Sequence, residues 1–247
     1  MLNIVVPMAG LGSRFTKEGY TKPKPLIDVK NKSMIQVVIE NLRPTSAHKF
    51  IFICQNEHDE TYSISHKLKD LAHGSDVILI NGLTEGAACT VLKARDYINN
   101  DDQLMIANSD QYVDIDINSY LEYGLNQNYD GLIMTMYASD PKWSYAMMGE
   151  DGFAKKVVEK EVVSNEATVG IYNFRNGKDF VEAAEKMISL DIRVNNEFYV
   201  APVYNMLIDK KAKIGVYNIG SVGNGMYGLG TPADLEYFLK HPVSSRF

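Results

Sequence analysis

The chain has 247 residues and carries 25 lysines and arginines against 31 aspartates and glutamates, which gives a formal net charge of −6. This length is enough for one large α/β domain, and the acidic balance offers no basic surface to duplex nucleic acid. No apolar run approaches the length of a membrane span, and the N-terminus lacks the basic leader of a signal peptide. We therefore expect a cytoplasmic protein without nucleic-acid or membrane partners.

Short β-type segments alternate with helical patterns through the first part of the chain, which is typical of βαβ units and a mostly parallel sheet. The predicted strands are 2–6, 49–54, 76–80, 103–108 and 131–138. Apolar residues on one face predict a helix over 33–42, which Pro44 terminates. A second helix is expected over 84–98, with Thr84 as its N-cap.

The pattern changes after Pro141. Three β-type segments then follow one another without helices, which predicts antiparallel strands over 144–150, 154–160 and 166–174. The remaining predicted elements are helices over 179–190 and 196–208, a strand over 212–219 and a closing helix over 232–239. The sequence thus predicts an α/β fold with a Rossmann-like, mostly parallel sheet flanked by helices and a small antiparallel excursion.

A glycine-rich loop, "PMAGLGSRF", follows the first predicted strand directly. In open parallel sheets, ligands bind beyond the carboxyl ends of the strands, where this loop lies. Gly10 and Gly12 allow backbone N–H groups to approach an anion closely, and Arg14 adds a bidentate phosphate donor. A tight turn would use the same glycines, so the loop alone does not decide the function. In the following "TKPKPL", Pro23 and Pro25 hold the neighbours of Lys24 extended and favour a positioned lysine.

The pattern G-x-G-S-R-F followed by P-K-P-L-x-x-V resembles the signature of the sugar-nucleotide pyrophosphorylases, a superfamily of nucleotidyltransferases. Four further segments are similar to motifs of that family: "TEGAA" (84–88) to its base-recognition segment, "ANSDQ" (107–111) to its metal-binding strand end, "VVEK" (157–160) to its second lysine and "GLGTPADLEYF" (228–238) to its closing helix. The resemblance implies a single nucleotidyltransferase domain over 1–247, with a nucleotide-binding core at 1–140 and an acceptor-binding part at 141–230.

The resemblance also implies roles for individual residues. Arg14 and Lys24 would hold the nucleotide phosphates and Lys160 the phosphate of the acceptor, and these three residues are expected to be catalytic. Asp110 would bind the expected cofactor, Mg²⁺, and it also follows an apolar strand that ends beside the glycine loop. An Asx turn at Asp110 and an ordinary charged strand end at Lys160 are the structural alternatives. The nucleotide-binding set is Ala9, Gly10, Gly12, Ser13, Arg14, Lys24, Glu85, Gly86 and Asp110.

The chain departs from the family pattern at three places. Gly228 stands where most relatives carry an aspartate that supplies a second metal ligand, so Asp114, Asp116 or Glu197 would replace it, or Asp110 would hold the metal with phosphates and water. Ala146 and Glu161 stand where relatives carry glycine and proline, which puts an ordinary hexose acceptor in question. The expected acceptor-binding residues are Trp143, Tyr145, Glu159, Tyr172, Glu197 and Tyr199.

The implied reaction is attack of an acceptor phosphate on the α-phosphorus of a nucleoside triphosphate, with release of pyrophosphate. CTP is the favoured nucleotide, and the acceptor would be a sugar 1-phosphate or another phosphometabolite for capsule or surface-glycan precursors. The sequence does not decide the oligomeric state, so a homo-oligomer stays an open alternative. Two alternatives remain: a GT-A type glycosyltransferase using the "DID" at 114–116 and a catalytically silent nucleotide sensor. Pyrophosphate release would separate all three.

Overall fold

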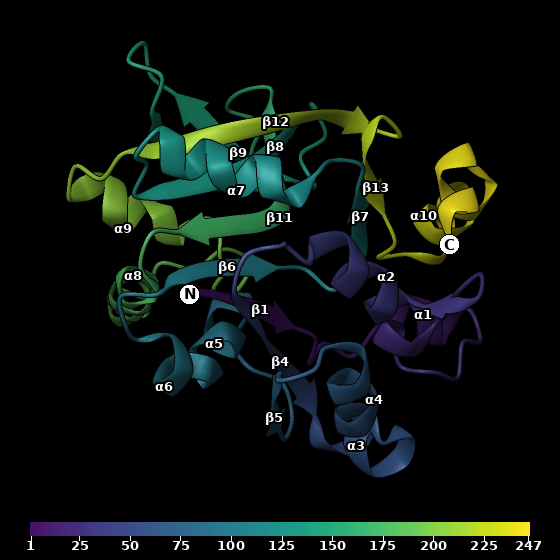
Figure 1. Cartoon of the computed structure of the whole chain (residues 1–247). Coiled ribbons are helices and arrows are strands. Elements are labelled where there is room, and N and C mark those ends of the chain that lie inside the picture. Colours follow the sequence, from purple (N-terminus) through teal and green to yellow (C-terminus); the bar gives the residue numbers. More distant parts are fainter.

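The computed structural model describes residues 1–247, in which eleven strands form one mixed sheet with helices on both faces (Figure 1). From edge to edge the sheet runs through β5 (Asp76–Ile80), β4 (His48–Gln55), β1 (Leu2–Pro7), β6 (Gln103–Ala107), β11 (Glu166–Phe174), β8 (Gly131–Tyr137), β12 (Ile214–Val222), β13 (Gly225–Gly228) and β7 (Gln111–Val113). The other strands are the hairpin β9 (Ser144–Met148) and β10 (Ala154–Glu159) beside β11, and the small ribbon β2 (Asp28–Val29) and β3 (Lys32–Ser33). The predicted fold class is confirmed.

The helices divide between the two faces of the sheet (Figure 1). One face is covered by α2 (Met34–Leu42), α3 (Asn56–Tyr62), α4 (Ile64–Leu71) and α7 (Ile117–Asn126). The other is covered by α5 (Ala87–Val91), the 3₁₀ turn η2 (Leu92–Ala94), α6 (Arg95–Ile98), α8 (Gly177–Ser189) and α9 (Val203–Asp209). Strand β1 explains the pattern, because Ile4 and Val6 enter one core and Val5 the other, as expected for a parallel strand that is buried on both faces.

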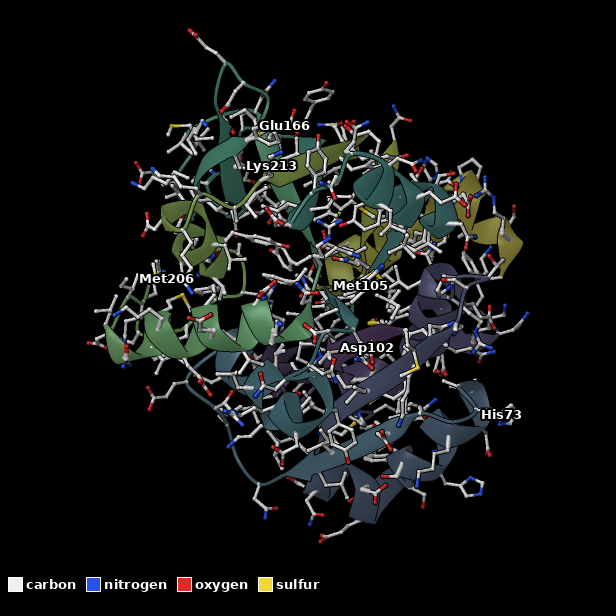
Figure 2. All side chains as sticks on the ribbon, turned by 60° about the vertical axis from the view of Figure 1, so that its left-hand side comes forward. His73, Asp102, Met105, Glu166, Met206 and Lys213 are labelled. Atoms are coloured by element: carbon white, nitrogen blue, oxygen red, sulfur yellow. The ribbon has the colours of Figure 1, made fainter.

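Side chains fill the space between the sheet and its helices (Figure 2). Met105 of β6 is completely buried in this packing, whereas His73, which follows α4, lies at the surface. None of the helices combines the length and the apolar character needed to cross a bilayer.

A third, smaller core joins the two ends of the chain. Phe15 of α1 (Ser13–Lys17) packs in one cluster with Leu235 and Phe238 of α10 (Pro232–Lys240). The chain ends in the 3₁₀ turn η3 (Pro242–Arg246) beside this cluster. Figure 1 shows α1 and α10 on the same side of the molecule, so the C-terminal helix supports the segment that carries the glycine loop.

Two predicted helices differ in the structure. The segment 84–98 is divided into α5, η2 and α6, and its N-cap is Gly86, with φ at 130°, and not Thr84. The hydroxyl of Thr84 instead donates to the Gly86 carbonyl. The helix predicted over 196–208 begins only at Val203, because Pro202 occupies its N-cap position and the preceding residues form turns.

Strand β11 also differs from its expected place. It lies inside the main sheet, antiparallel to both β6 and β8, so only the β9–β10 hairpin forms a separate excursion. The short strands β7 and β13 and the helices α3, α4 and α7 were not predicted. Strand β7 begins directly after Asp110 and pairs with β13.

Candidate functional site

The carboxyl ends of β1 and β6 carry the glycine loop and the segment around Asp110, and a cleft lies between them and the segment before α5. The cleft measures about 280 Å³. It brings together five of the predicted site residues: Ala9, Gly10, Lys24, Gly86 and Glu197. The other residues that line it are Pro7, Met8, Leu83, Thr84, Ala87, Thr90, Asn108 and Ser109. Because β1 and β6 are parallel neighbours, their ends deliver both segments to one edge of the sheet.

The glycine loop offers a run of free backbone donors. The N–H groups of Ala9, Gly10, Leu11 and Gly12 donate no hydrogen bond within the protein. Gly12 has φ at 60°, and its carbonyl accepts from the first turn of α1. Successive free N–H groups favour an anion, so the loop can hold phosphate groups.

Two further predicted residues stand at the start of α1. Ser13 and Arg14 are its first residues, and both side chains are exposed. The guanidinium of Arg14 forms no hydrogen bond or ion pair within the protein. It is therefore free to bind a ligand that enters beside the loop.

Lys24 and Asp110 form an ion pair, although 86 residues separate them in the chain. The distance between Lys24 Nζ and Asp110 Oδ2 is 2.8 Å, and the two side chains are only 22% and 23% exposed. Pro23 is extended, with φ at −59° and ψ at 145°, as predicted, but Lys24 begins the 3₁₀ turn η1 (Lys24–Leu26), so Pro25 is not extended. The pair joins the residue expected to hold phosphates to the residue expected to hold the metal.

Two glycines make room for this ion pair. A Cβ at Gly12 would lie 3.2 Å from the Cβ of Lys24, and a Cβ at Gly230 would lie 2.6 Å from Asp110 Oδ2. The Leu229 N–H donates to the Asp110 carbonyl and fixes the backbone on this side. The "GLGTP" segment therefore packs against the candidate metal ligand, even though it carries no carboxylate itself.

Asp110 is the candidate metal ligand that pairs with Lys24, and Glu197 is the carboxylate that lines the cleft itself. No cluster of three or more metal-binding side chains exists in the protein. Asp114 is paired with Arg246, and Asp116 caps α7 through bonds to Asn118 and Ser119 that lower the pKa of Asp116. A single carboxylate fits Mg²⁺, which keeps several waters and takes further oxygens from phosphates. Asp114 and Asp116 are also the two carboxylates of the "DID" that the glycosyltransferase alternative would use, and both already have partners within the protein.

The segment before α5 is docked on a distant backbone. Phe198 N–H donates to the Glu85 carbonyl at 2.8 Å, and Ala88 N–H donates to the Phe198 carbonyl at 3.0 Å. A Cβ at Gly86 would lie 2.5 Å from both the N and the O of Phe198, so only glycine fits. The Glu85 side chain is 67% exposed and pairs with Arg193 at 3.2 Å. Glu85 thus contributes its backbone carbonyl to the docking of this segment, while its exposed carboxylate lies outside the cleft.

A second cluster lies on β10 and the loop after α8, where the sequence placed the acceptor. Lys160 Nζ donates to the Tyr199 hydroxyl at 2.6 Å, and this hydrogen bond raises the pKa of Lys160. Glu197 adds negative charge beside Lys160 and Tyr199 and also lines the cleft, so it connects the two regions. Lys160 itself does not line the cleft.

Buried polar side chains form the inner part of this cluster. Glu159 is 8% exposed and accepts a short hydrogen bond from the Ser144 hydroxyl. Burial raises the pKa of Glu159, and the nearby Glu197 adds to this effect. The Tyr172 hydroxyl lies 2.9 Å from that of Thr168. A buried carboxylate and hydroxyls of this kind can bind a hydroxylated or amine-bearing acceptor.

Two of the expected acceptor residues lie elsewhere. Tyr145 is fully buried in the core, and its hydroxyl donates to the Asp140 carbonyl. The Trp143 ring is partly buried and is covered by the Lys142 ammonium 5.0 Å from its centroid. The structure does not bring these two side chains to the cleft.

Glu159→Gln is expected to raise the free energy of unfolding at pH 8 by about 1 kcal/mol, or the Tm by roughly 2–4 °C. Because the pKa of Glu159 is raised in the folded protein, its contribution to stability is present at low pH and is lost as the pH rises through that pKa. Glutamine removes the buried charge, and its amide oxygen can still accept from Ser144. Thermal unfolding at pH 8 and pH 4 checks this, since the gain should disappear at pH 4. A less stable variant at pH 8 would contradict it.

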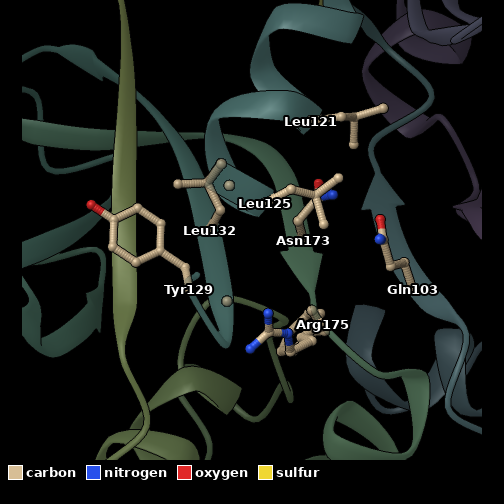
Figure 3. A pocket seen from close by; sticks show the side chains of 10 residues that line it. Gln103, Leu121, Leu125, Tyr129, Leu132, Asn173 and Arg175 are labelled. Carbon is tan, nitrogen blue, oxygen red and sulfur yellow. The ribbon is translucent and has the colours of Figure 1, made fainter. Parts of the chain in front are cut away.

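A separate small cavity lies at the opposite end of the strands. Figure 3 shows Gln103, Leu132 and Asn173 around it, near the amino ends of β6 and β8. Its volume is about 40 Å³, which is room for about one water molecule. It does not contact any of the predicted site residues.

A model of the nucleotidyl transferase family matches residues 4–197, and the chain therefore belongs to that family. The chain is also similar to the mannose-1-phosphate guanylyltransferase catalytic subunit beta of Dictyostelium discoideum, with 24% identity over 183 residues. The matched region covers 70% of this chain and 49% of the relative. The chain thus spans about half the length of this curated relative.

Solved structures share the fold of the chain. The nucleoside-diphosphate-sugar pyrophosphorylase from Vibrio cholerae RC9 has a TM-score of 0.80 at 24% identity, over 96% of this chain and 99% of that chain. A UDP-glucose pyrophosphorylase complexed with UDP-glucose has a TM-score of 0.77 at 16% identity, over 100% of both chains. These likenesses show the fold. Together with the family match they confirm the superfamily that the glycine and lysine motifs predicted.

Proposed function

We propose that the protein transfers a nucleoside monophosphate from a nucleoside triphosphate to a phosphorylated acceptor and releases pyrophosphate. The observation that carries the proposal is the meeting of Lys24 and Asp110 at 2.8 Å beside the free N–H groups of the glycine loop. A cation, a carboxylate and a row of free donors suit a metal-bound polyphosphate. Membership in the nucleotidyl transferase family supports the same reaction.

In the proposed reaction, an oxygen of the acceptor phosphate attacks the α-phosphorus. A new P–O bond forms, and the bond from the α-phosphorus to the bridging oxygen breaks, so that its electron pair leaves with pyrophosphate. No general base is needed, because a phosphate monoester with a second pKa of about 6 is already mostly ionised at neutral pH. The main barrier is therefore repulsion between the two anionic substrates.

Positively charged side chains and backbone N–H groups of the chain would reduce this repulsion. Arg14, Lys24 and the N–H groups of the glycine loop would bind the nucleotide phosphates, and Lys160 would bind the phosphate of the acceptor. Asp110 would hold Mg²⁺ together with phosphate oxygens and water. When bound, Mg²⁺ supplies further neutralisation of the phosphate charge. The raised pKa keeps Lys160 positively charged at neutral pH.

The choice of substrates is a finer proposal. CTP is favoured by the likeness of "KPKPLIDV" and "YGLGTP" to the cytidylyltransferase-like branch of the superfamily. The acceptor would be a sugar 1-phosphate or a non-sugar phosphometabolite, held by the buried Glu159 and Tyr172 and by Tyr199. Such a product would be a cytoplasmic precursor of a capsule or another surface glycan.

Pyrophosphate release tests the proposal. Each of CTP, UTP, GTP and dTTP is incubated with Mg²⁺ and a panel of phosphorylated acceptors, and pyrophosphate is measured with and without acceptor. We expect release with at least one pairing, and the strongest release with CTP. A nucleoside diphosphate as the product, with a nucleotide-sugar as the donor, would instead identify a glycosyltransferase. Nucleotide binding without any release would identify a sensor.

A further inference from the structure

The last residue of β4 lies between the two segments that form the walls of the cleft. Strand β4 is the neighbour of both β1 and β5, so the loops that follow β1 and β5 both pass its carboxyl end. Gln55 ends β4 and is 7% exposed. A buried polar side chain at this position needs hydrogen-bond partners, and the two loops provide them.

Gln55 joins the two loops directly. Its Nε2 donates to the Ala9 carbonyl at 2.6 Å and to the Gly82 carbonyl at 2.9 Å. Ala9 belongs to the glycine loop, and Gly82 leads into the segment 83–87 on the other side of the cleft. Both hydrogens of the amide are used, so Gln55 has none left for a ligand.

No other hydrogen bond joins the two walls. The glycine loop is otherwise anchored by Met8 N–H to the Ile53 carbonyl, and the segment 83–87 by its bonds to Phe198. Each wall is thus fixed to a different part of the protein. The two bonds of the Gln55 amide are therefore the hydrogen-bonded link between the walls of the cleft.

We propose that Gln55 is a positioning residue that sets the width of the nucleotide cleft before the ligand arrives. This inference rests on the proposed function, because the cleft is taken as the place of the nucleotide. With both carbonyls held, the walls are ordered in the free protein, and binding does not have to restore their separation. Without the donor, the two carbonyls lose their partner, and the loops separate or rotate toward water.

Gln55→Glu tests the donor role with little change in shape. An ionised carboxylate cannot donate and is repelled by both carbonyl oxygens, whereas a protonated carboxyl can donate one hydrogen bond. Burial beside two carbonyls raises the pKa of the introduced carboxyl, so protonation falls within an accessible pH range. The variant should therefore bind nucleotide poorly at high pH and recover part of its affinity as the pH falls.

The measurement is calorimetric binding of CTP, UTP, GTP or dTTP with Mg²⁺ and without acceptor. At pH 8 we expect the affinity of Gln55→Glu for the best-binding nucleotide to be about 10- to 100-fold below that of the wild type. The factor by which the wild type binds more tightly than Gln55→Glu should become smaller as the pH is lowered to 5.5. Comparing the two proteins at each pH cancels the titration of the nucleotide, whose phosphate has a pKa of about 6.

Asn205→Asp is the matched control. The Asn205 amide also makes two bonds to backbone, at 2.8 Å each, but both go to Val157 in β10, and Asn205 does not line the cleft. This change from amide to carboxylate should leave nucleotide affinity within about twofold of wild type at every pH. A similar loss in Asn205→Asp would show a general effect of the fold and would overturn the inference.

Two results for the folded Gln55→Glu protein would overturn the inference while leaving the proposed function intact. One is wild-type affinity at pH 8, and the other is a loss of affinity that does not change with pH. Circular dichroism and the unfolding midpoint establish that the variant is folded. If the wild type binds none of the four nucleotides, the proposed function itself fails, and this separate outcome is seen before any variant is compared.

Discussion

Lys24→Ala is expected to lower the rate of pyrophosphate release by about 100- to 1000-fold while the protein stays folded. The ammonium of Lys24 pairs with the candidate metal ligand, Lys24 lines the cleft together with Ala9 and Gly10, and no other cation lines it. Its removal takes away one of the cations that would neutralise the phosphate charge and leaves Asp110 without its partner. Because both side chains keep some contact with water, the loss of stability should be about 1 kcal/mol.

Lys22→Ala is the control for this prediction. Lys22 lies two residues away and pairs with Asp28 at 2.7 Å, with both side chains half exposed or more. Its removal should change the rate of pyrophosphate release by less than about twofold. Steady-state rates and thermal unfolding of both variants give the comparison. Wild-type turnover in a folded Lys24→Ala protein would remove Lys24 from the catalytic assignment.

Asp110→Asn is expected to reduce Mg²⁺-dependent pyrophosphate release by about 1000-fold, even at saturating nucleotide. Asparagine keeps the shape and can accept a hydrogen bond from Lys24, but it lacks the charge that attracts a divalent cation. The protein should therefore fold normally. The measurement is the rate of pyrophosphate release as a function of Mg²⁺ concentration.

Asp116→Asn tests one of the alternative carboxylates. Asp116 caps α7, and asparagine is also a good N-cap, so this variant should stay folded and active. If Asp116→Asn loses activity and Asp110→Asn keeps it, the ligand has been assigned to the wrong carboxylate. Full recovery of Asp110→Asn at ordinary Mg²⁺ concentrations would likewise contradict the assignment.

Local signals in the sequence predicted the parts of the site that depend on local structure. The apolar strand before the glycine loop and the strand before Asp110 are short-range patterns, and parallel strands bring their carboxyl ends to the same edge. The sequence therefore placed Asp110 beside the glycine loop. It did not predict the ion pair of Asp110 with Lys24, because that contact depends on how the segment with η1 folds back toward Asp110.

The errors came from contacts between distant segments. Thr84 has the chemistry of an N-cap, but the segment docks on the backbone of Phe198, and this contact leaves no room for a Cβ at Gly86, which is the N-cap. Tyr145 was expected at the acceptor because of its motif, yet its strand turns the ring into the core. Gln55 offered one signal, a polar residue that directly follows the apolar run 50–54, but its partners lie in two loops that the sequence does not show to be adjacent.

The position of β11 in the middle of the sheet limits the order in which the strands can pair. Strands β5, β4, β1 and β6 come from the first part of the chain and can pair as they leave the ribosome, but the outer edge of β6 has no partner until residues 166–174 have been made. An unpaired edge is a template for pairing with other chains. Strand β8 meets the same strand from the other side, so the two halves of the sheet are separate until β11 enters between them. If the first four strands pair before β11 is made, association with other chains at the open edge of β6 competes with folding.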